Sequence, residues 1–207
     1  MKITFLGTNG WYDTDGSHTL CVTIETADSF IILDAGSGLF QMAPDAAKEK
    51  PAFLLLSHFH MDHICGLHGL SKLMFPAGLT ILGQAGTAET VSRIVARPFT
   101  VPLDRLAYPV ILRDLDSIGN LPFDLQYLFM DHSDPCLGYR ITAEGRTLAF
   151  CTDTGYCDNA VKLAANADLL ITECSFVPGE SDTGWPHLNP ETAARIAIES
   201  GAKKLIL

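Results

Sequence analysis

The strongest constraint in this sequence is a cluster of metal-binding side chains in residues 57–63, Ser-His-Phe-His-Met-Asp-His, directly after the apolar run 53–56. Its four candidate ligands are His58, His60, Asp62 and His63. Three imidazoles this close repel one another when protonated, so the simplest explanation is that they share a cation. Imidazole and carboxylate ligands indicate a Zn²⁺, Fe or Mn²⁺ site rather than a thiolate-rich structural site. Four ligands in one turn indicate two ions, which makes hydrolysis the leading hypothesis.

The bulk composition describes a folded protein rather than a tail or a membrane segment. A chain of 207 residues with 47% hydrophobic content can fill one large core. The charged fraction of 18% argues against disorder. No apolar stretch is long enough to span a membrane, and residues 1–7 are too short for a secretory signal and read as a first strand. Six scattered cysteines without CxxC spacing indicate free thiols and a cytoplasmic protein.

The net charge of −10 restricts the class of partner. Such a surface repels polyanions at long range, so extended nucleic acid is an unfavourable ligand. Two divalent ions would offset about four of these charges and could reverse the sign locally. A small anionic substrate therefore stays compatible with the sequence.

Ionisable residues follow several strand-like runs at their C-terminal ends. Strands are expected near residues 3–6, 20–26, 30–33, 53–56, 79–82, 110–112, 123–130, 137–141, 146–151, 168–172 and 203–207. The run 123–130 leads to His132, 147–151 leads to Asp153, and 168–172 leads to Glu173. Loops at strand ends commonly converge on one site, so these side chains are expected to meet.

Two segments have helical patterns. Residues 87–97 place apolar side chains on one face and stop before Pro98. A second helix is expected after Asn189 as a cap, with Pro190 at its first position and Gly201 at its end. The proline-rich stretch 98–122 reads as an irregular excursion.

The order of these residues resembles the metallo-β-lactamase superfamily: His-x-His-x-Asp-His after a buried strand, a solitary His, and an Asp in the Thr-Asp-Thr-Gly turn 152–155. The resemblance runs from Gly7-Thr8 to the end of the chain. It implies an α/β fold, a four-layer αβ/βα sandwich of two mixed sheets with helices outside. We expect residues 1–207 to form a single domain of this kind, truncated at its C-terminal end.

The resemblance also implies a ligand set. Metal one would be held by His58, His60 and His132, metal two by Asp62 and His63, and Asp153 would bridge both. The ions would be zinc, with manganese or iron as alternatives. The family's usual last ligand is a His just beyond a stretch like 203–207, and this sequence does not contain it, so the second site is expected to be weak or empty. Asp62 would orient the attacking water or accept its proton.

Two further segments resemble motifs of ribonuclease Z-type phosphodiesterases. Residues 167–176 resemble the "HEAT" segment and residues 187–194 the "HST" segment. The resemblance makes Glu173 and His187 the pair that donates a proton to the leaving oxygen. Thr172 stands where the motif has His, and Leu188-Asn189 replace Ser-Thr. The alternative interpretation is a structural Glu and a loop His.

The expected substrate is a small phosphodiester or nucleotide-like molecule. Ribonuclease Z carries a long basic arm between the solitary His and the bridging Asp, but here only 21 positions separate His132 from Asp153. The rival hypotheses are hydrolysis of a thioester, lactone or β-lactam, and a weakly active binding module with an incomplete second metal site. Dimers are common in the superfamily, but no residue here indicates an interface.

Several other residues are compatible with a role near the site. Asp34 is a candidate acceptor for an imidazole ligand, with an ordinary turn cap as the equal alternative. Trp11-Tyr12 are a candidate aromatic wall for a base or ring, with partner contact or packing as the equal alternative, and Trp185-Pro186 beside His187 are the better candidate. His18 reads as an exposed loop residue and His68 as part of a helix after the motif. The thiols of Cys65, Cys157 and Cys174 read as small buried apolar groups.

Overall fold

The computed structural model describes residues 1–207, and the chain divides into two compact units, Met1–Asn120 and Leu121–Leu207. Each unit contains one mixed sheet, as the sequence predicts. The expected strands are all present, with ends within three residues of those predicted. No helix is long and apolar enough to cross a membrane.

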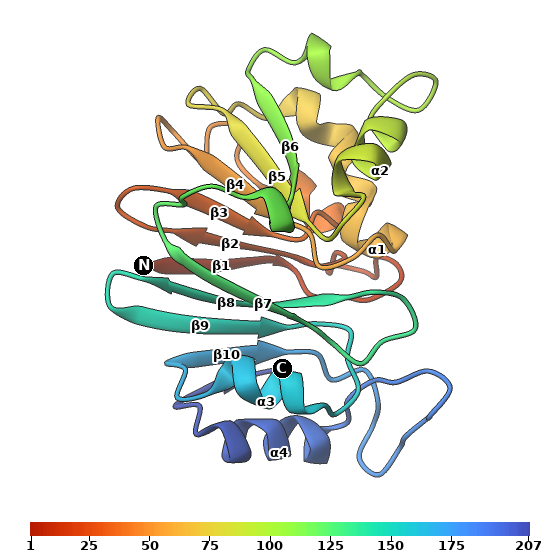
Figure 1. Ribbon diagram of the computed structural model, residues 1–207. Helices are drawn as coiled ribbons and strands as arrows, with labels where there is room; N and C mark the ends of the chain where they lie inside the picture. Colours follow the sequence, from red (N-terminus) through yellow and green to blue (C-terminus); the bar gives the residue numbers. More distant parts are fainter. The chain divides into compact units, whose positions relative to one another are not determined.

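The first unit is built on a six-stranded sheet in the order β1-β2-β3-β4-β5-β6 (Figure 1). Its strands are β1 (Lys2–Gly7), β2 (Cys21–Glu25), β3 (Phe30–Leu33), β4 (Ala52–Leu55), β5 (Leu79–Gly83) and β6 (Val110–Asp114). Its helices are α1 (Met61–Ile64) and α2 (Thr87–Ile94), with 3-10 turns η1 (Ser37–Gln41), η2 (Cys65–Lys72), η3 (Leu103–Arg105) and η4 (Leu115–Ser117). Strands β3 to β6 are parallel, so their C-terminal ends share one edge of the sheet.

The core of the first unit lies on one face of this sheet. Ile32, Leu54 and Ile81 from the central strands are fully buried there. Leu39 of η1, Leu67 of η2 and Val91 of α2 pack against them, in one apolar cluster. Central parallel strands are buried on both faces, which explains why 30–33 and 53–56 are continuous apolar runs.

The second unit has a five-stranded sheet in the order β11-β10-β9-β8-β7. Its strands are β7 (Asp124–Phe129), β8 (Leu137–Ala143), β9 (Arg146–Cys151), β10 (Leu169–Thr172) and β11 (Leu205–Ile206), and its helices are α3 (Asp158–Ala164) and α4 (Pro190–Ser200). Strands β9, β10 and β11 are parallel, and β8 runs antiparallel to both β7 and β9. Strands β7, β9 and β10 therefore all end at the same edge.

Both helices of the second unit pack on its sheet. Leu163 of α3 and Ile196 of α4 share an apolar cluster with Ala149 of β9 and Leu170 of β10. The sequence did not predict α3. It is seven residues long and its N-cap, Cys157, makes no side-chain capping bond, so it lacks the usual start signal.

Helix α4 begins and ends where the sequence predicts. The Asn189 side chain accepts from the Thr192 amide at 2.8 Å, the Thr192 hydroxyl accepts from the Asn189 amide at 3.0 Å, and Gly201 closes the helix at φ 69°. Helix α2 instead ends at Ile94, three residues earlier than expected. His68 lies in the 3-10 turn η2 rather than in an α-helix.

Removal of the α4 cap should destabilise the second unit measurably. Asn189→Ala removes the acceptor for the Thr192 amide, and caps of this kind contribute about 1 kcal/mol. We expect a lower urea midpoint by circular dichroism. Asn189→Ser, which keeps a capping oxygen, is the matched control and should stay close to the wild-type midpoint. Equal midpoints for Asn189→Ala and the wild type would contradict the assignment.

Candidate metal and phosphodiester site

The candidate site residues of the first unit lie at the C-terminal edge of β3 and β4. Asp34 follows β3 and Ser57-His58 follow β4, and these parallel neighbours pair Leu33 with Leu55. Because adjacent parallel strands end at the same edge of a sheet, the residues that follow them lie close together. The carboxylate of Asp34 is fully buried there, as are Ser57 and His58.

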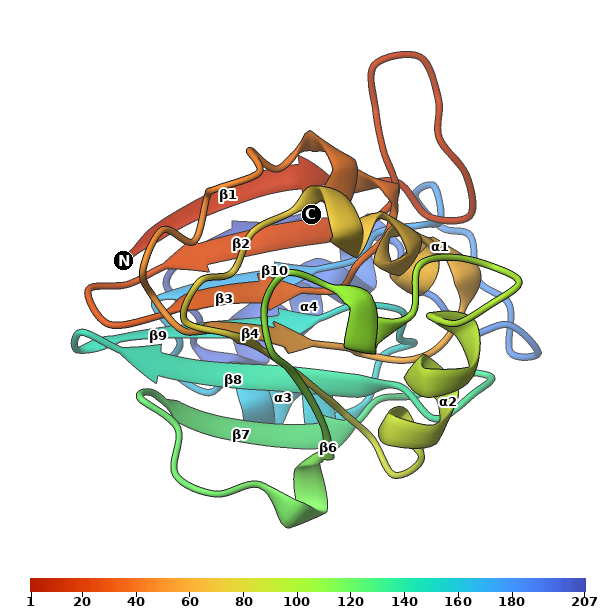
Figure 2. The same cartoon turned by 90° about the horizontal axis from the view of Figure 1, so that it is seen from above.

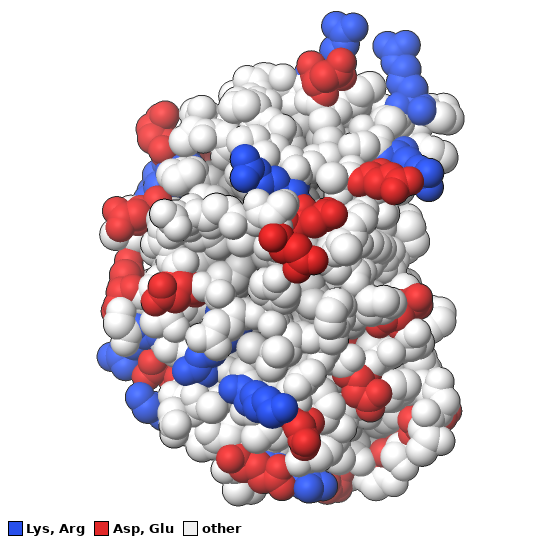
Figure 3. All heavy atoms as spheres, in the orientation of Figure 1, with Lys and Arg blue, Asp and Glu red and all other residues white.

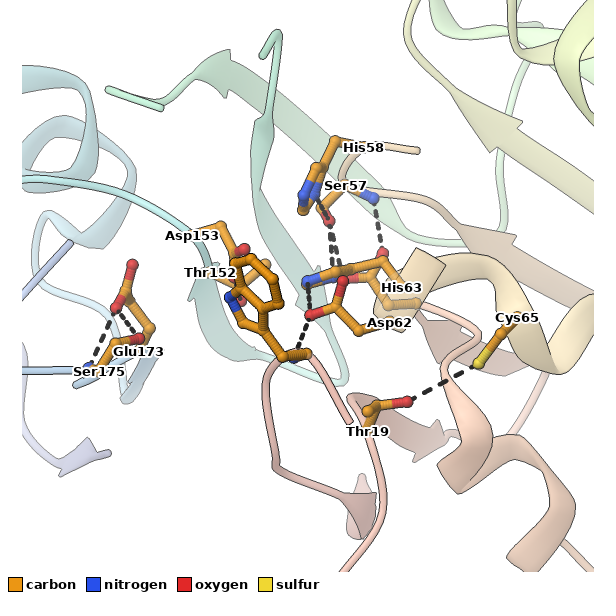
Figure 4. Close-up of polar contacts among 12 residues, drawn as sticks. Thr19, Ser57, His58, Asp62, His63, Cys65, Thr152, Asp153, Glu173 and Ser175 are labelled. Atoms are coloured by element: carbon orange, nitrogen blue, oxygen red, sulfur yellow. Dashed lines mark hydrogen bonds and ion pairs between the residues drawn. The ribbon is translucent and has the colours of Figure 1, made fainter. Parts of the chain in front are cut away.

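The buried Asp34 carboxylate accepts hydrogen bonds from the motif. The Ser57 amide donates to Oδ1 at 2.7 Å, the Ser57 hydroxyl donates to Oδ2 at 2.8 Å, and His63 Nδ1 lies 2.8 Å from Oδ2. Ser57 Oγ is also 3.0 Å from His58 Nδ1 (Figure 4). Because a carboxylate only accepts, Nδ1 of His63 must donate, and Ser57 Oγ, already donating to Asp34, accepts from His58. Both rings are then in the tautomer whose Nε2 has a lone pair for a metal.

The imidazoles of the motif are packed as a shared cation site requires. The ring of His58 lies 4.4 Å from that of His60 and 4.2 Å from that of His63 between centroids. His63 Nε2 is 3.5 Å from Asp62 Oδ2, the two proposed donors to metal two. Ligand atoms of a tetrahedral zinc with bonds of about 2.1 Å lie roughly 3.4 Å apart. The donor atoms of His63 and Asp62 therefore have a spacing that fits such an ion.

Removal of the Asp34 charge should weaken metal binding without touching a ligand. Asp34→Asn places an amide where three donors point, so one imidazole loses its acceptor. We expect zinc affinity to fall by about 10- to 100-fold, as is typical when a metal-binding imidazole loses its acceptor. Competition with a chromogenic chelator measures this affinity.

Asp168→Asn is the matched control for that experiment. Its carboxylate also collects several donors, and the bonds from Lys203, Thr147 and Arg146 hold its pKa at about 2. It lies before β10, at the opposite end of the strand from Glu173. Unchanged zinc affinity in Asp34→Asn, or an equal loss in both variants, would contradict the role of Asp34.

Asp62 is held by a residue distant in sequence. The backbone N–H of Trp11 donates to Asp62 Oδ2 at 2.7 Å, and Trp11 has a φ of 64°, in the left-handed region that few large side chains adopt. Asp34 and Asp153 also have positive φ, at 57° and 47°. Such strain clusters at functional sites, and three candidate site residues share it here.

The candidate site residues of the second unit lie at the edge where β7, β9 and β10 end. His132 follows β7 and Asp153 follows β9, and His132 Nε2 is 3.9 Å from Asp153 Oδ2. This separation also suits two neighbouring ligands of one ion. The Thr152 hydroxyl donates to Asp153 Oδ1 at 2.9 Å, which orients the carboxylate. The ring of His187 lies 5.5 Å from that of His132.

Glu173 and His187 form a buried pair in the second unit. His187 Nδ1 lies 2.6 Å from Glu173 Oε1, and both side chains are less than a tenth exposed. The same carboxylate accepts from the Thr154 amide at 2.7 Å and from the Ser175 hydroxyl at 2.6 Å (Figure 4). Nδ1 of His187 therefore donates to Glu173, which fixes the orientation of the ring. A carboxylate in this position stabilises a protonated imidazole.

The departures from the family motif have structural counterparts. Thr172 replaces the motif's His, and its hydroxyl donates to the Cys151 carbonyl of the neighbouring strand at 2.7 Å. Leu188 is fully buried in the α3–α4 core. Asn189 caps α4, a task that Ser or Thr also performs. The Glu173–His187 contact is formed in this chain with all three substitutions present.

Aromatic rings surround His187. Trp185 contacts it edge-on with centroids 4.8 Å apart, and Phe176 lies 5.9 Å away. Sequence reasoning missed Phe176, Thr154 and Ser175. Thr154 lies in the Thr-Asp-Thr-Gly turn that the sequence had already singled out, which is the signal that could have led to it. Phe176 carries no such local signal.

The remaining candidates fall outside the site or at its margin. His18 bonds to Asp13 at 3.0 Å in the β1–β2 loop and is part-buried rather than fully exposed. His68 stacks edge-on against Phe40. All six cysteines are free, as predicted. Cys65, Cys157 and Cys174 are half-buried, so their prediction as buried thiols is wrong: they lie in turns at the sheet edge, where packing is incomplete.

Comparison with known proteins defines the class. The family described as "Beta-lactamase superfamily domain" matches residues 30–207, and the chain belongs to this family. It is thus a member of a metallo-hydrolase superfamily. The chain is 28% identical to "Probable metallo-hydrolase YhfI" of Bacillus subtilis over 219 residues, covering all of this chain and 86% of that protein. It is 27% identical to "Ribonuclease Z" of Nostoc punctiforme over 266 residues, covering 83% of that enzyme.

Solved structures confirm the predicted fold class. The crystal structure of the metallo-β-lactamase fold protein YhfI from Bacillus subtilis matches 98% of this chain and 83% of its own with a TM-score of 0.78, at 28% identity. Human tRNase Z, short form, matches 99% of this chain and 90% of its own, also with a TM-score of 0.78, at 22% identity. The α/β metallo-β-lactamase fold expected from the sequence is therefore present.

Proposed function

We propose that this protein is a metal-dependent phosphodiesterase acting on a small phosphodiester or nucleotide-like substrate. The observation that carries the proposal is the buried Glu173–His187 pair, with 2.6 Å between Oε1 and Nδ1. Hydrolysis of a thioester by a metal-activated water does not need a separate acid of this kind to the same degree, because the alkoxide that leaves a phosphodiester is a far poorer leaving group than a thiolate.

The proposed metal ligands are assigned by donor type and by the family resemblance. His58, His60 and His132 offer imidazole nitrogens and Asp153 a carboxylate oxygen, a donor set that suits zinc, with manganese or iron as alternatives. Asp62 and His63 would hold the second ion. When bound, two such ions supply a water of lowered pKa and neutralise charge on the phosphoryl oxygens.

The chain's own residues divide the remaining work. Asp34 and Ser57 fix the tautomers of His63 and His58, so that the ligand nitrogens need no reorganisation. Asp62, held by the Trp11 amide, orients the attacking water or accepts its proton. His187 donates a proton from Nε2 to the leaving oxygen, and Glu173 positions it.

Two observations support a small substrate over a long nucleic acid. The alignment with the Nostoc ribonuclease Z runs over 266 positions although this chain has 207 residues, whereas that with YhfI runs over 219. The ribonuclease therefore contains insertions that this chain lacks. On the face drawn in Figure 3, Lys and Arg side chains are interspersed with Asp and Glu rather than joined in one basic strip. With a net charge of −10, this surface does not favour a polyanion.

A substrate panel tests the proposal. The zinc-loaded protein is expected to hydrolyse bis(p-nitrophenyl) phosphate, and to do so faster than a thioester, a lactone or a β-lactam at equal concentration. Hydrolysis of a thioester or lactone without any phosphodiester turnover would contradict it. Absence of turnover on the whole panel, with zinc bound, would support the binding module instead.

A further inference from the structure

The loop between β1 and β2, residues 8–18, presents two adjacent aromatic side chains to solvent. Figure 2 shows this loop extending beyond the ends of the strands it connects. Trp11 is 71% exposed and Tyr12 is 69% exposed. A single exposed apolar residue needs no explanation, but two large neighbouring aromatics in one loop indicate a contact surface.

The loop is fixed rather than loose. The Asn9 side chain donates to Thr14 Oγ1 at 2.8 Å and accepts from the Ser17 hydroxyl at 2.7 Å. The amides of Thr8 and Asn9 both donate to the His18 carbonyl at 2.9 Å. These bonds close the base of the loop and tie its two arms together. The aromatic pair is therefore held ready before any ligand arrives, which lowers the entropic cost of binding.

The loop is fixed to the 3-10 turn η1 through Asp13. Its carboxylate accepts from the Thr19 amide at 3.1 Å and from the Ser37 hydroxyl, and it lies 3.0 Å from His18 Nδ1. These donors, the Ser37 hydroxyl first, lower the pKa of Asp13. The carboxylate thus stays charged and keeps the loop in place.

The loop also touches the proposed reaction centre. The Trp11 amide donates to Asp62 Oδ2 at 2.7 Å, and a Cβ added at Gly10 would lie 3.9 Å from the same oxygen. The Trp11 side chain therefore belongs to the residue whose backbone amide contacts Asp62, the carboxylate assigned to the attacking water. A ring attached to a phosphodiester at this centre lies within reach of an indole at this position.

We propose that Trp11 and Tyr12 form a stacking platform for the base of a nucleoside phosphodiester, so that the platform selects nucleoside esters over simple alkyl esters. This inference rests on the proposed function. Stacking on an aromatic face is open to every base, because each has a π-face, and it needs no specific donor or acceptor from the loop. The platform thus predicts preference for a nucleoside without preference among bases.

Two substrates with the same leaving group test the platform: thymidine 5′-(p-nitrophenyl phosphate) and methyl p-nitrophenyl phosphate. Tyr12→Ala removes one ring of the platform and leaves in place the Trp11 amide that holds Asp62. We expect kcat/KM on the thymidine ester to fall at least about fivefold, mainly through KM, and to stay within about twofold on the methyl ester. Tyr12→Phe keeps a ring and should keep most of the preference.

A binding measurement gives a second readout that does not depend on turnover. The chain has two tryptophans, so Trp185→Phe leaves Trp11 as the single emitter. Thymidine 5′-monophosphate should quench this emission on stacking, whereas ribose 5-phosphate should not. In a Trp11→Phe variant, which leaves Trp185, the quenching by thymidine 5′-monophosphate should be lost.

The outcomes separate the platform from the proposed function. An equal loss on both esters in Tyr12→Ala, or equal quenching by the nucleotide and the sugar phosphate, overturns the platform and leaves the phosphodiesterase proposal intact. If the wild type hydrolyses neither ester, the proposed function fails, and the quenching experiment still decides whether the loop binds a base.

Discussion

Replacement of His60 by Ala should remove the metal-dependent activity almost completely. His60 is one of the imidazoles assigned to the first ion, and its ring lies 4.4 Å from that of His58. Loss of a ligand removes several kcal/mol of charge stabilisation in the transition state, which corresponds to a rate loss of about a thousandfold or more. Atomic emission on dialysed protein should show about one zinc per chain fewer than the wild type.

His68→Ala is the matched control for this substitution. It removes the same side chain from the 3-10 turn η2, where the ring packs against Phe40. We expect wild-type zinc content and rate. Because His60 is part-buried rather than fully enclosed, the His60 variant should keep its circular dichroism spectrum. Wild-type zinc content in His60→Ala would show that the ligand assignment is wrong.

The second large effect is expected at His187, and its size should depend on the leaving group. A positioned general acid contributes about 100- to 10,000-fold when the leaving oxygen needs a proton. His187→Ala should therefore lose kcat in this range on a dinucleotide, whose leaving group is an alkoxide. On bis(p-nitrophenyl) phosphate the loss should be much smaller, because p-nitrophenolate departs without a proton.

Glu173→Gln should reproduce part of this pattern, since Glu173 acts through His187. Its carboxylate orients the ring from 2.6 Å, and an amide there cannot stabilise the protonated imidazole. Glu199→Gln is the control, because Glu199 is an exposed carboxylate on α4 that bonds to Tyr156 and Arg195. A loss in His187→Ala that is equal for both leaving groups would rule out the proton-donor role.

Local patterns were sufficient to predict the strands and most of the candidate ligands. The run 53–56 and the motif after it are adjacent in sequence, so the strand and its ligands could be predicted together. Likewise, Asn189, Pro190 and Gly201 mark both ends of α4 by backbone chemistry alone. The separation of the chain into two compact units, each with its own sheet, has no such local signal.

The contacts that organise the site depend on strand pairing and could not be predicted from spacing alone. Asp34 and His63 are 29 positions apart and meet because β3 and β4 are parallel neighbours. Trp11 and Asp62 are 51 positions apart. Their hydrogen bond forms with Trp11 at a positive φ, and the sequence of the loop gives no sign of that backbone conformation. Asp34 was equally compatible with a turn cap until its partners were known.

Zinc titration of chelator-treated protein, with phosphodiester hydrolysis as the readout, tests the central claim most directly. The account predicts no hydrolysis of bis(p-nitrophenyl) phosphate after chelation and a return of the rate as zinc is added. The return should be complete in the wild type, need about 10- to 100-fold more free zinc in Asp34→Asn, and be absent in His60→Ala. Hydrolysis that survives chelation, or a zinc-loaded protein that turns over thioesters but no phosphodiester, would contradict the account.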